Sequence, residues 1–272
     1  MKYIKILVIA FFAAGLAVFG ASVIRSIVTQ DPTKPEITSD REELELSTSY
    51  EEEDLLQGLT ASDGKDGDLT DQIMAGDFSQ FSEPGVSSLT YVVFDSSNQA
   101  ASLTRQVRFT DYESPKFTLS EPLVFIEGEE DNGLSRVGAS DAIDGDVSSL
   151  VRILDNTVNY QLSGDYTVQA QITNSLGDTQ EVLLPAHVIT SSRARAHIQL
   201  KQSLVYIKPG TEFHPEEYVD YVESEEGDRI GTDSLSITSQ VDTRTEGVYE
   251  VRYQTDGDTG RGETWLTVIV RE

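Results

Sequence analysis

The residues with the clearest chemical potential are aspartates in one short stretch, ASDGKDGDLTD, at residues 61–71. Calcium takes about six to eight oxygen ligands, which proteins supply from carboxylates and from backbone carbonyls of glycine-bent loops. Asp63, Asp66 and Asp68 are therefore candidate calcium ligands. The same residue types also close tight turns without an ion, because aspartate accepts hydrogen bonds from nearby backbone N–H groups and glycine adopts a positive φ.

The stretch recurs further along the chain. Residues 141–146 repeat it as DAIDGD, and residues 223–228 carry a weaker copy in which glutamates replace aspartates. The second copy adds Asp141, Asp144 and Asp146 to the candidate calcium ligands. An EF-hand is excluded, because lysine and glycine stand where that loop needs further oxygen ligands. Since the glycine persists while the acidic residues vary, we interpret the stretch as a structural turn, with calcium binding as the alternative.

Motifs for catalysis or for a bound cofactor are missing from the sequence. The three histidines, His187, His197 and His214, do not have the spacing of a zinc-binding motif. The sequence contains no G-x-S-x-G, no phosphate-binding P-loop and no dinucleotide fingerprint. Carboxylates are so frequent that no pair stands out as the acid and base of a glycosidase. We therefore predict no catalytic residues, no cofactor apart from calcium in the alternative above, and a protein that is not an enzyme.

Charge and cysteine content limit the classes of partner. The 272 residues carry a net charge of −27 and include no cysteine. The charge argues against nucleic acid as a partner, because binding phosphates requires a basic face. It argues equally against docking to anionic lipid headgroups. Without cysteine neither a disulfide nor a thiolate metal site can form, so a secreted protein would have to fold without covalent cross-links.

The N-terminus has a different composition from the rest of the chain. Lys2 and Lys5 lead into an uncharged run over residues 6–24. At about 1.5 Å per residue, this run comes close to spanning a hydrocarbon core of about 30 Å. We predict one transmembrane helix here, with the lysines in the cytoplasm and residues 31–272 outside the cell in a single-pass membrane protein. The alternative is a secreted protein, released by cleavage of a signal peptide near residues 20–22.

Beyond residue 30 the sequence has the pattern of short β-strands. Runs rich in valine, isoleucine, tyrosine and threonine are bounded by glycine, aspartate, serine and asparagine, as at 87–95, 166–173, 248–255 and 264–270. Short strands punctuated by such turns are typical of a β-sandwich.

Landmarks recur along this part of the chain in a constant order, with a period near 80 residues. Each copy has the acidic stretch, a polar turn before the last strand, and a glycine that opens a strand, namely Gly85, Gly164 and Gly247. The first two copies also begin with the pattern D-x-x-x-P, at Asp31 and Asp111. We therefore predict an all-β fold of three tandem domains, which follow the N-terminal segment 1–30 and cover residues 31–110, 111–190 and 191–272.

The combined pattern resembles the bacterial Ig-like repeat, which occurs in tandem in bacterial surface proteins and in pesticidal crystal proteins. The resemblance is carried by D-x-x-x-P, by the acidic D-G-D and by a glycine-opened hairpin, which is clearest in QVDTRTEGVYEVRYQTD at 240–256. It covers nearly all of residues 31–272. The resemblance implies Ig-like β-sandwich domains with an extracellular role as a spacer, in adhesion or in binding a polymer, and does not imply catalysis.

These features predict a membrane-anchored, non-enzymatic protein that acts as a structural spacer or adhesion rod at the bacterial cell surface. The alternative function is a glycan- or protein-binding module that uses the loops at the sandwich ends, with calcium as an ion that rigidifies the chain. The expected partners are the membrane, through residues 6–24, and either an envelope polymer or a surface protein.

Overall fold

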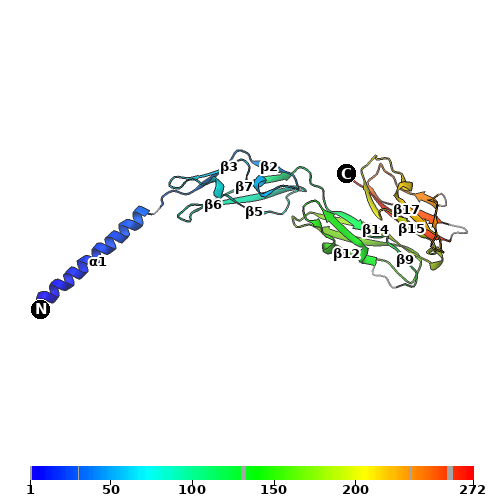
Figure 1. The fold of residues 1–272 in the computed structure, drawn as a ribbon, viewed down its shortest axis with the longest axis horizontal. Coiled ribbons are helices and arrows are strands. Elements are labelled where there is room, and N and C mark those ends of the chain that lie inside the picture. Colours follow the sequence, from blue (N-terminus) through cyan, green and yellow to red (C-terminus); the bar gives the residue numbers. More distant parts are fainter. Residues whose placement is uncertain (1, 30, 130–132, 233–234, 256–259) are drawn as a thin grey trace. The chain divides into compact units, whose positions relative to one another are not determined.

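The structure is a computed structural model that describes residues 2–29, 31–129, 133–232, 235–255 and 260–272 (Figure 1). Two compact units form along the chain, Met1–Thr110 and Asp111–Glu272. Beyond the N-terminal helix, the regular structure of the described residues consists of β-strands and short 3-10 turns. The all-β part of the predicted fold is therefore correct.

The N-terminal part of the prediction requires a correction. The chain begins with the helix α1 (Lys2–Thr29). A bilayer crossing needs about 20 consecutive, predominantly apolar residues in one helix. None of the helices in the described part of the chain has both the length and the apolar character for such a crossing. The transmembrane helix predicted over residues 6–24 is therefore wrong, and the structure does not show the single-pass localisation or the membrane partner that depended on it.

The first unit contains two sheets, which we call the first sheet pair (residues 36–109). One sheet has the strand order β1-β3-β4, and the other has the order β2-β7-β6-β5. Strand β2 runs parallel to β7, whereas β6 forms antiparallel hairpin-like pairs with β5 and β7. The strands are β1 (Glu36–Ser39), β2 (Glu43–Leu46), β3 (Leu59–Asp63), β4 (Gly67–Asp68), β5 (Met74–Phe78), β6 (Val86–Phe94) and β7 (Ala100–Phe109).

The second unit repeats this topology twice, as the second sheet pair (residues 116–189) and the third sheet pair (residues 197–270). The sheet orders are β11-β10-β8 with β12-β13-β14-β9, and β15-β17-β18 with β16-β21-β20-β19. The strands of the second pair are β8 (Lys116–Leu119), β9 (Val124–Ile126), β10 (Val137–Asp141), β11 (Gly145–Asp146), β12 (Arg152–Asn156), β13 (Gly164–Thr173) and β14 (Thr179–Ile189). Those of the third are β15 (His197–Leu200), β16 (Leu204–Ile207), β17 (Val219–Glu223), β18 (Arg229–Ile230), β19 (Leu235–Ser239), β20 (Gly247–Thr255) and β21 (Gly262–Val270).

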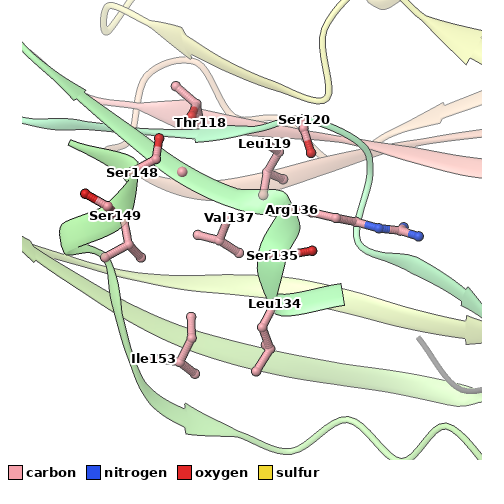
Figure 2. A pocket seen from close by; sticks show the side chains of 12 residues that line it. Thr118, Leu119, Ser120, Leu134, Ser135, Arg136, Val137, Ser148, Ser149 and Ile153 are labelled. Carbon is pink, nitrogen blue, oxygen red and sulfur yellow. The ribbon is translucent and has the colours of Figure 1, made fainter. Parts of the chain in front are cut away.

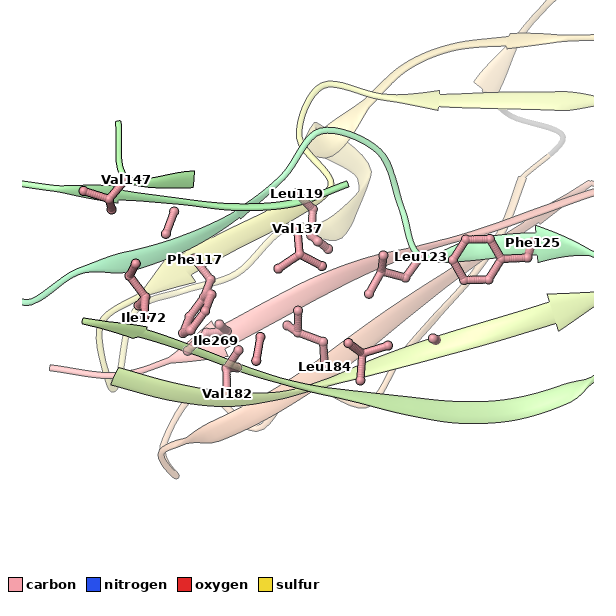
Figure 3. Close-up of a cluster of buried hydrophobic side chains, with 14 of the residues drawn as sticks. Phe117, Leu119, Leu123, Phe125, Val137, Val147, Ile172, Val182, Leu184 and Ile269 are labelled. Carbon is pink, nitrogen blue, oxygen red and sulfur yellow. The ribbon is translucent and has the colours of Figure 1, made fainter. Parts of the chain in front are cut away.

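Alternating burial along the strands directs apolar side chains into a core between the two sheets of each pair. In β3, for example, residues 59, 61 and 63 are buried, whereas residues 60 and 62 are exposed, as the two-residue period of a strand requires. Figure 3 shows the core of the second sheet pair, where Phe117 and Leu119 face Ile172 and Leu184. Ile269 of β21 belongs to the same cluster, so the third sheet pair packs against the second within their common unit.

The glycine that opens a strand in each copy has two different structural roles. Gly85 has a φ of 78°, whereas Gly164 and Gly247 do not have a positive φ. A Cβ atom added at Gly247 would lie 3.3 Å from the ring of Tyr249, and one added at Gly164 would lie 3.6 Å from Tyr166. These two glycines therefore leave room for an aromatic ring two residues further along the strand.

We expect Gly247→Val to destabilise the third sheet pair by about 1–3 kcal/mol, because the isopropyl group must displace the Tyr249 ring. The hydroxyl of Tyr249 donates a hydrogen bond to Thr245 O at 3.0 Å, and this bond would be strained as well. Chemical denaturation monitored by circular dichroism measures the change. Gly231→Val is the matched control, since an added Cβ there has no atom within 4 Å. Equal stability of the two variants would contradict this role for Gly247.

Candidate functional site

The acidic stretch of the first sheet pair forms the turn between β3 and β4. Asp63 Oδ1 accepts hydrogen bonds from the backbone N–H groups of Lys65 (2.7 Å) and Asp66 (3.0 Å). Gly67 closes the turn with a φ of 76°. Asp68 Oδ1 accepts from the N–H of Thr70 at 2.9 Å, at the start of the following 3-10 turn. One oxygen of each of these two aspartates therefore caps the backbone, as the turn interpretation predicts.

Two further segments meet this turn at the same end of the first sheet pair. Asp31, just before β1, accepts hydrogen bonds from the N–H and the hydroxyl of Thr33, and that hydroxyl also lies 3.2 Å from Asp63 Oδ1. Residues 95–99, which connect β6 to β7, contact both segments. The N–H of Ser96 donates to Asp66 Oδ2 at 2.9 Å, and the side-chain amide of Gln99 donates to the carbonyls of residues 31 and 33.

This convergence buries carboxylate oxygens that accept no hydrogen bond from any described residue. Asp31, Asp63 and Asp95 are each 7% exposed. Among the described residues, none forms a hydrogen bond with the Oδ2 atoms of these three side chains. Oxygens of Asp31, Asp63 and Asp66 lie within 4.8 Å of one another. The nearest cation is Lys65, whose Nζ lies 3.6 Å from Asp31 Oδ2.

The local hydrogen bonds favour the charged forms of these carboxyl groups. Donation by the hydroxyl and the N–H of Thr33 lowers the pKa of Asp31. Donation by the backbone of Asp66 lowers the pKa of Asp63, although burial opposes it. The contact with Thr70 lowers the pKa of Asp68. At neutral pH the end of the first sheet pair therefore holds several carboxylates as anions.

The second copy of the stretch forms the same turn but satisfies its buried oxygens with protein donors. Asp141 Oδ1 accepts from the N–H groups of Ile143 (2.8 Å) and Asp144 (2.9 Å), as Asp63 does in the first copy. Asp141 Oδ2, however, accepts from the side-chain amide of Asn174 at 3.1 Å. Asn174 takes the place of Asp95, so an amide that can donate replaces a carboxylate that cannot.

The remaining candidates of the second copy are also engaged. Asp144 Oδ2 accepts from the N–H of Ser175 at 2.7 Å, and Asp146 Oδ1 accepts from the N–H of Ser148 at 3.0 Å. The hydroxyl of Tyr112 donates to Asp178 Oδ2 at 2.8 Å. Burial, followed by this bond to Asp178, raises the pKa of Tyr112, so the hydroxyl keeps its proton. The second end is thus a closed hydrogen-bond network.

The third copy uses an uncharged residue in place of the capping aspartate. Ser224 Oγ accepts from the N–H groups of Glu226 and Asp228, both at 3.2 Å. The turn therefore begins one residue later than the sequence comparison, which aligned residue 223 with Asp63, had placed it. Thr255 ends β20, and its hydroxyl donates to Gly260 O at 2.9 Å. The third end thus places a neutral serine where the first has the anionic Asp63.

A pocket of about 560 Å³ lies elsewhere, on the second sheet pair (Figure 2). Its polar lining consists mainly of hydroxyl groups, including those of Thr118, Ser120 and Ser149. Arg136 is the only ionisable side chain among the described lining residues, and it donates to the carbonyls of Pro122 and Val124. A pocket without an acid–base pair offers contacts for a polar ligand but no groups for proton transfer.

A second cluster of ionisable groups, which the sequence analysis did not predict, lies within the unit Asp111–Glu272. The buried ring of His187 on β14 bonds to Asp165 through Nδ1 (2.9 Å) and to Glu250 on β20 through Nε2 (2.7 Å). The indole of Trp265 stacks on this ring with a centroid separation of 3.9 Å. Trp265 on β21 thus links the second and third sheet pairs through His187.

The carboxylates beside His187 determine its charge. Burial disfavours the imidazolium, but the hydrogen bonds and negative charges of Glu250 and Asp165 together outweigh burial and raise the pKa of His187. Glu250 is the more effective partner, since its side chain is 25% exposed whereas that of Asp165 is 90% exposed and screened by water. The other charged groups at this contact, Arg252 and Glu263, pair with each other beside Trp265.

We expect the stability that His187 contributes to depend on pH. A raised folded-state pKa means that the contribution is complete below the unfolded value of about 6.5 and is lost as pH rises through the folded-state pKa. The difference in melting temperature between the wild type and His187→Gln should therefore be largest near pH 5.5 and shrink toward pH 9. His197→Gln, at an exposed histidine, is the control. A difference that grows with pH would contradict the assignment.

The repeated sheet pairs and their capped turns place the chain among Ig-like β-sandwich proteins. Residues 199–270, within the third sheet pair, match the family model of the bacterial surface protein Ig-like domain. The resemblance to the bacterial Ig-like repeat is thereby confirmed, and the match supports an extracellular or surface location.

A curated relative is the pesticidal crystal protein Cry22Aa of Bacillus thuringiensis. It is 31% identical over 141 residues, which are 48% of this chain and 18% of the relative. The chain thus spans less than a fifth of that protein's length. Similarities to solved structures are also found, at low sequence identity.

One such structure contains the M60 catalytic domain with the CBM51-1 and CBM51-2 domains of Clostridium perfringens ZmpB. It has 12% identity, covers 87% of this chain and 31% of its own, and gives a TM-score of 0.24. Human CDH23 EC21-23 has 12% identity, covers 87% of this chain and 100% of its own, and gives a TM-score of 0.21. Scores this low carry no information about what this chain binds.

Proposed function

We propose that the chain is a non-enzymatic bacterial surface protein that acts as a structural spacer or in adhesion, through three tandem Ig-like domains at residues 31–110, 111–190 and 191–272. The observation that carries this proposal is the threefold recurrence of one sheet-pair topology, combined with the family match over residues 199–270. Tandem sandwich domains of this kind can act as a spacer between two parts of a protein, and this role requires no catalytic centre.

The acidic character of the chain supports the same role. A net charge of −27 keeps a surface protein soluble and discourages association between sheet edges. In each sheet pair the apolar faces of the two sheets are buried against each other. This core stabilises the fold without disulfides. The purified chain, tested against peptidase, esterase and glycosidase substrates, should give no turnover above that of a heat-denatured sample. Turnover that follows the folded protein would overturn the proposal.

A second candidate function is binding of a glycan or a surface protein. The observation that favours it is the hydroxyl-lined pocket on the second sheet pair, since serine and threonine hydroxyls both donate to and accept from the hydroxyls of a sugar. Sedimentation of the chain with isolated cell-wall material tests this function. Saturable binding that Ser149→Leu abolishes would support the binding module. A chain that remains in the supernatant at all concentrations would support a spacer.

A further inference from the structure

We propose that Asp31, Asp63 and Asp66, with Asp95 beside them, bind one calcium ion at the end of the first sheet pair. This site is independent of whether the chain is a spacer or a binding module. It differs from the predicted set of ligands, because Asp31 and Asp95 come from the entry segment and from the β6–β7 turn. Asp68 lies outside the group of oxygens within 4.8 Å.

The first observation for a cation is the set of buried oxygens without donors. Each carboxylate of Asp31 and Asp63 uses Oδ1 to cap the backbone and leaves Oδ2 buried. Asp95 follows the same pattern, since its Oδ1 accepts from the N–H groups of Ser97 (2.8 Å) and Gln99 (2.7 Å). A buried carboxylate oxygen that accepts no hydrogen bond is costly in free energy. Turn formation alone gives no reason to place three such oxygens at one end of the first sheet pair.

The second observation comes from the repeats within the chain. In the second copy Asn174 replaces Asp95, and its amide donates to the Oδ2 atom of Asp141, the counterpart of Asp63. In the third copy the uncharged Ser224 stands at the position of Asp63. The second end is thus satisfied by protein groups alone, and the third has no carboxylate at this capping position. The first end keeps its carboxylates and lacks the compensating donors, so a cation is the missing partner.

The ligand chemistry and spacing favour calcium among the common divalent cations. The oxygens of the cluster are hard ligands, which suit calcium and magnesium rather than metals that prefer nitrogen or sulfur. Calcium–oxygen distances of about 2.3–2.6 Å place oxygens on opposite sides of the ion about 4.6–5.2 Å apart. The carboxylate oxygens of Asp31, Asp63 and Asp66 lie within 4.8 Å of one another, so one ion of this kind can contact all three. Magnesium would require a tighter octahedron, with distances of about 2.0–2.1 Å.

The ammonium group of Lys65 would compete with calcium for the carboxylates of this site. This ammonium lies 3.6 Å from Asp31 Oδ2 and also donates to the hydroxyls of Ser96 and Ser97. One ammonium does not balance the four carboxylates, and the side chain of Lys65 is 48% exposed, so it can rotate into solvent when calcium enters. Removing this positive charge should therefore strengthen calcium binding, which is the opposite of what loss of a structural ion pair would do.

Isothermal titration of the chelator-treated full chain with calcium chloride tests the site. We expect one ion per chain, with binding weakened at least tenfold in Asp31→Asn and in Asp63→Asn. Asparagine keeps the Oδ1 acceptor that caps the turn, so these variants remove charge while retaining the backbone hydrogen bonds. Asp141→Asn, the same change in the second copy, is the matched control and should leave the calcium affinity unchanged.

Lys65→Met provides a readout that does not depend on the fold of the aspartate variants, and should tighten binding at least threefold. Absence of saturable binding at millimolar calcium in the wild type would overturn the proposal. Equal losses from Asp63→Asn and Asp141→Asn would overturn it too, because they would indicate diffuse binding to an acidic surface. Weaker binding in Lys65→Met, or magnesium binding as tight as calcium binding, would also contradict it.

Discussion

Replacement of Tyr253 by alanine should lower the stability of the third sheet pair by about 3–5 kcal/mol, the range for removing a large buried aromatic side chain. Tyr253 is fully buried in the core, and its hydroxyl donates a 2.7 Å hydrogen bond to Pro215 O, in the 3-10 turn Pro215–Tyr218. Burial raises the pKa of this hydroxyl, so it remains a donor at all ordinary pH values. The side chain thus joins β20 to the segment that precedes β17.

Two further variants separate packing from hydrogen bonding in this site. Tyr253→Phe should cost only about 1 kcal/mol, because it keeps the ring and loses one hydrogen bond. Tyr249→Phe removes a hydroxyl from a more exposed ring on the same strand and should cost less. Denaturant unfolding of the full chain, followed by tyrosine and tryptophan fluorescence, measures these differences. A Tyr253→Ala variant within about 1 kcal/mol of the wild type would contradict the buried anchor.

Arg105→Ala should destabilise the first sheet pair by a similar amount, about 3–5 kcal/mol. Arg105 is 2% exposed, and its guanidinium donates to the carbonyls of Gln57 (2.6 Å) and Leu55 (2.7 Å) and to the hydroxyl of Tyr91 (2.9 Å). Alanine would leave these buried acceptors without a donor, and each unsatisfied group costs about 1–3 kcal/mol. The guanidinium of Arg105 also lies over the Tyr91 ring, 4.8 Å from the ring centroid, which adds a cation–π contact.

The matched control for Arg105 is the exposed Arg41. Its ion pair with Asp40 is short, but both side chains are about half exposed and screened by water, so Arg41→Ala should cost far less stability than Arg105→Ala. Arg105→Lys should lie between the two, because a single ammonium cannot reach both carbonyls with the geometry of a guanidinium. Thermal unfolding of the three variants ranks them. Equal effects of Arg105→Ala and Arg41→Ala would show that the buried guanidinium does not hold the segment at Leu55 and Gln57 in place.

Local features of the fold were accessible from the sequence because they depend on nearby residues. Gly67 and Gly145 have a positive φ after an aspartate that caps the turn, and this combination needs only the five residues of the turn itself. The period near 80 residues likewise reflects the repeated order of strands. The displacement of the third turn to Ser224 escaped detection, because serine can cap a backbone as aspartate does without resembling it in charge.

Contacts between residues far apart in the sequence could not be predicted from any single stretch of the chain. The parallel pairing of β2 with β7 joins residues about 60 apart, and no short pattern encodes it. Asp31 and Asp95 were recognised as parts of separate landmarks, but only the sandwich brings both to the β3–β4 turn. A signal was present, since the acidic turn and the polar turn before the last strand recur in the same order in each copy, and the entry pattern recurs in the first two. His187 and Glu250 come together from different repeats, and their sequence contexts contain no corresponding signal.

Exposure of the chain on intact cells is the most direct test of a surface protein. Cells that produce it are treated with a sulfonated amine-reactive reagent that does not cross the cytoplasmic membrane, and the labelled lysines are then mapped by mass spectrometry. We expect labelling of the exposed Lys65, Lys201 and Lys208 before lysis, to the extent seen with purified protein. Labelling of these lysines only after lysis, under conditions where a known surface protein is modified, would contradict a location outside the cell.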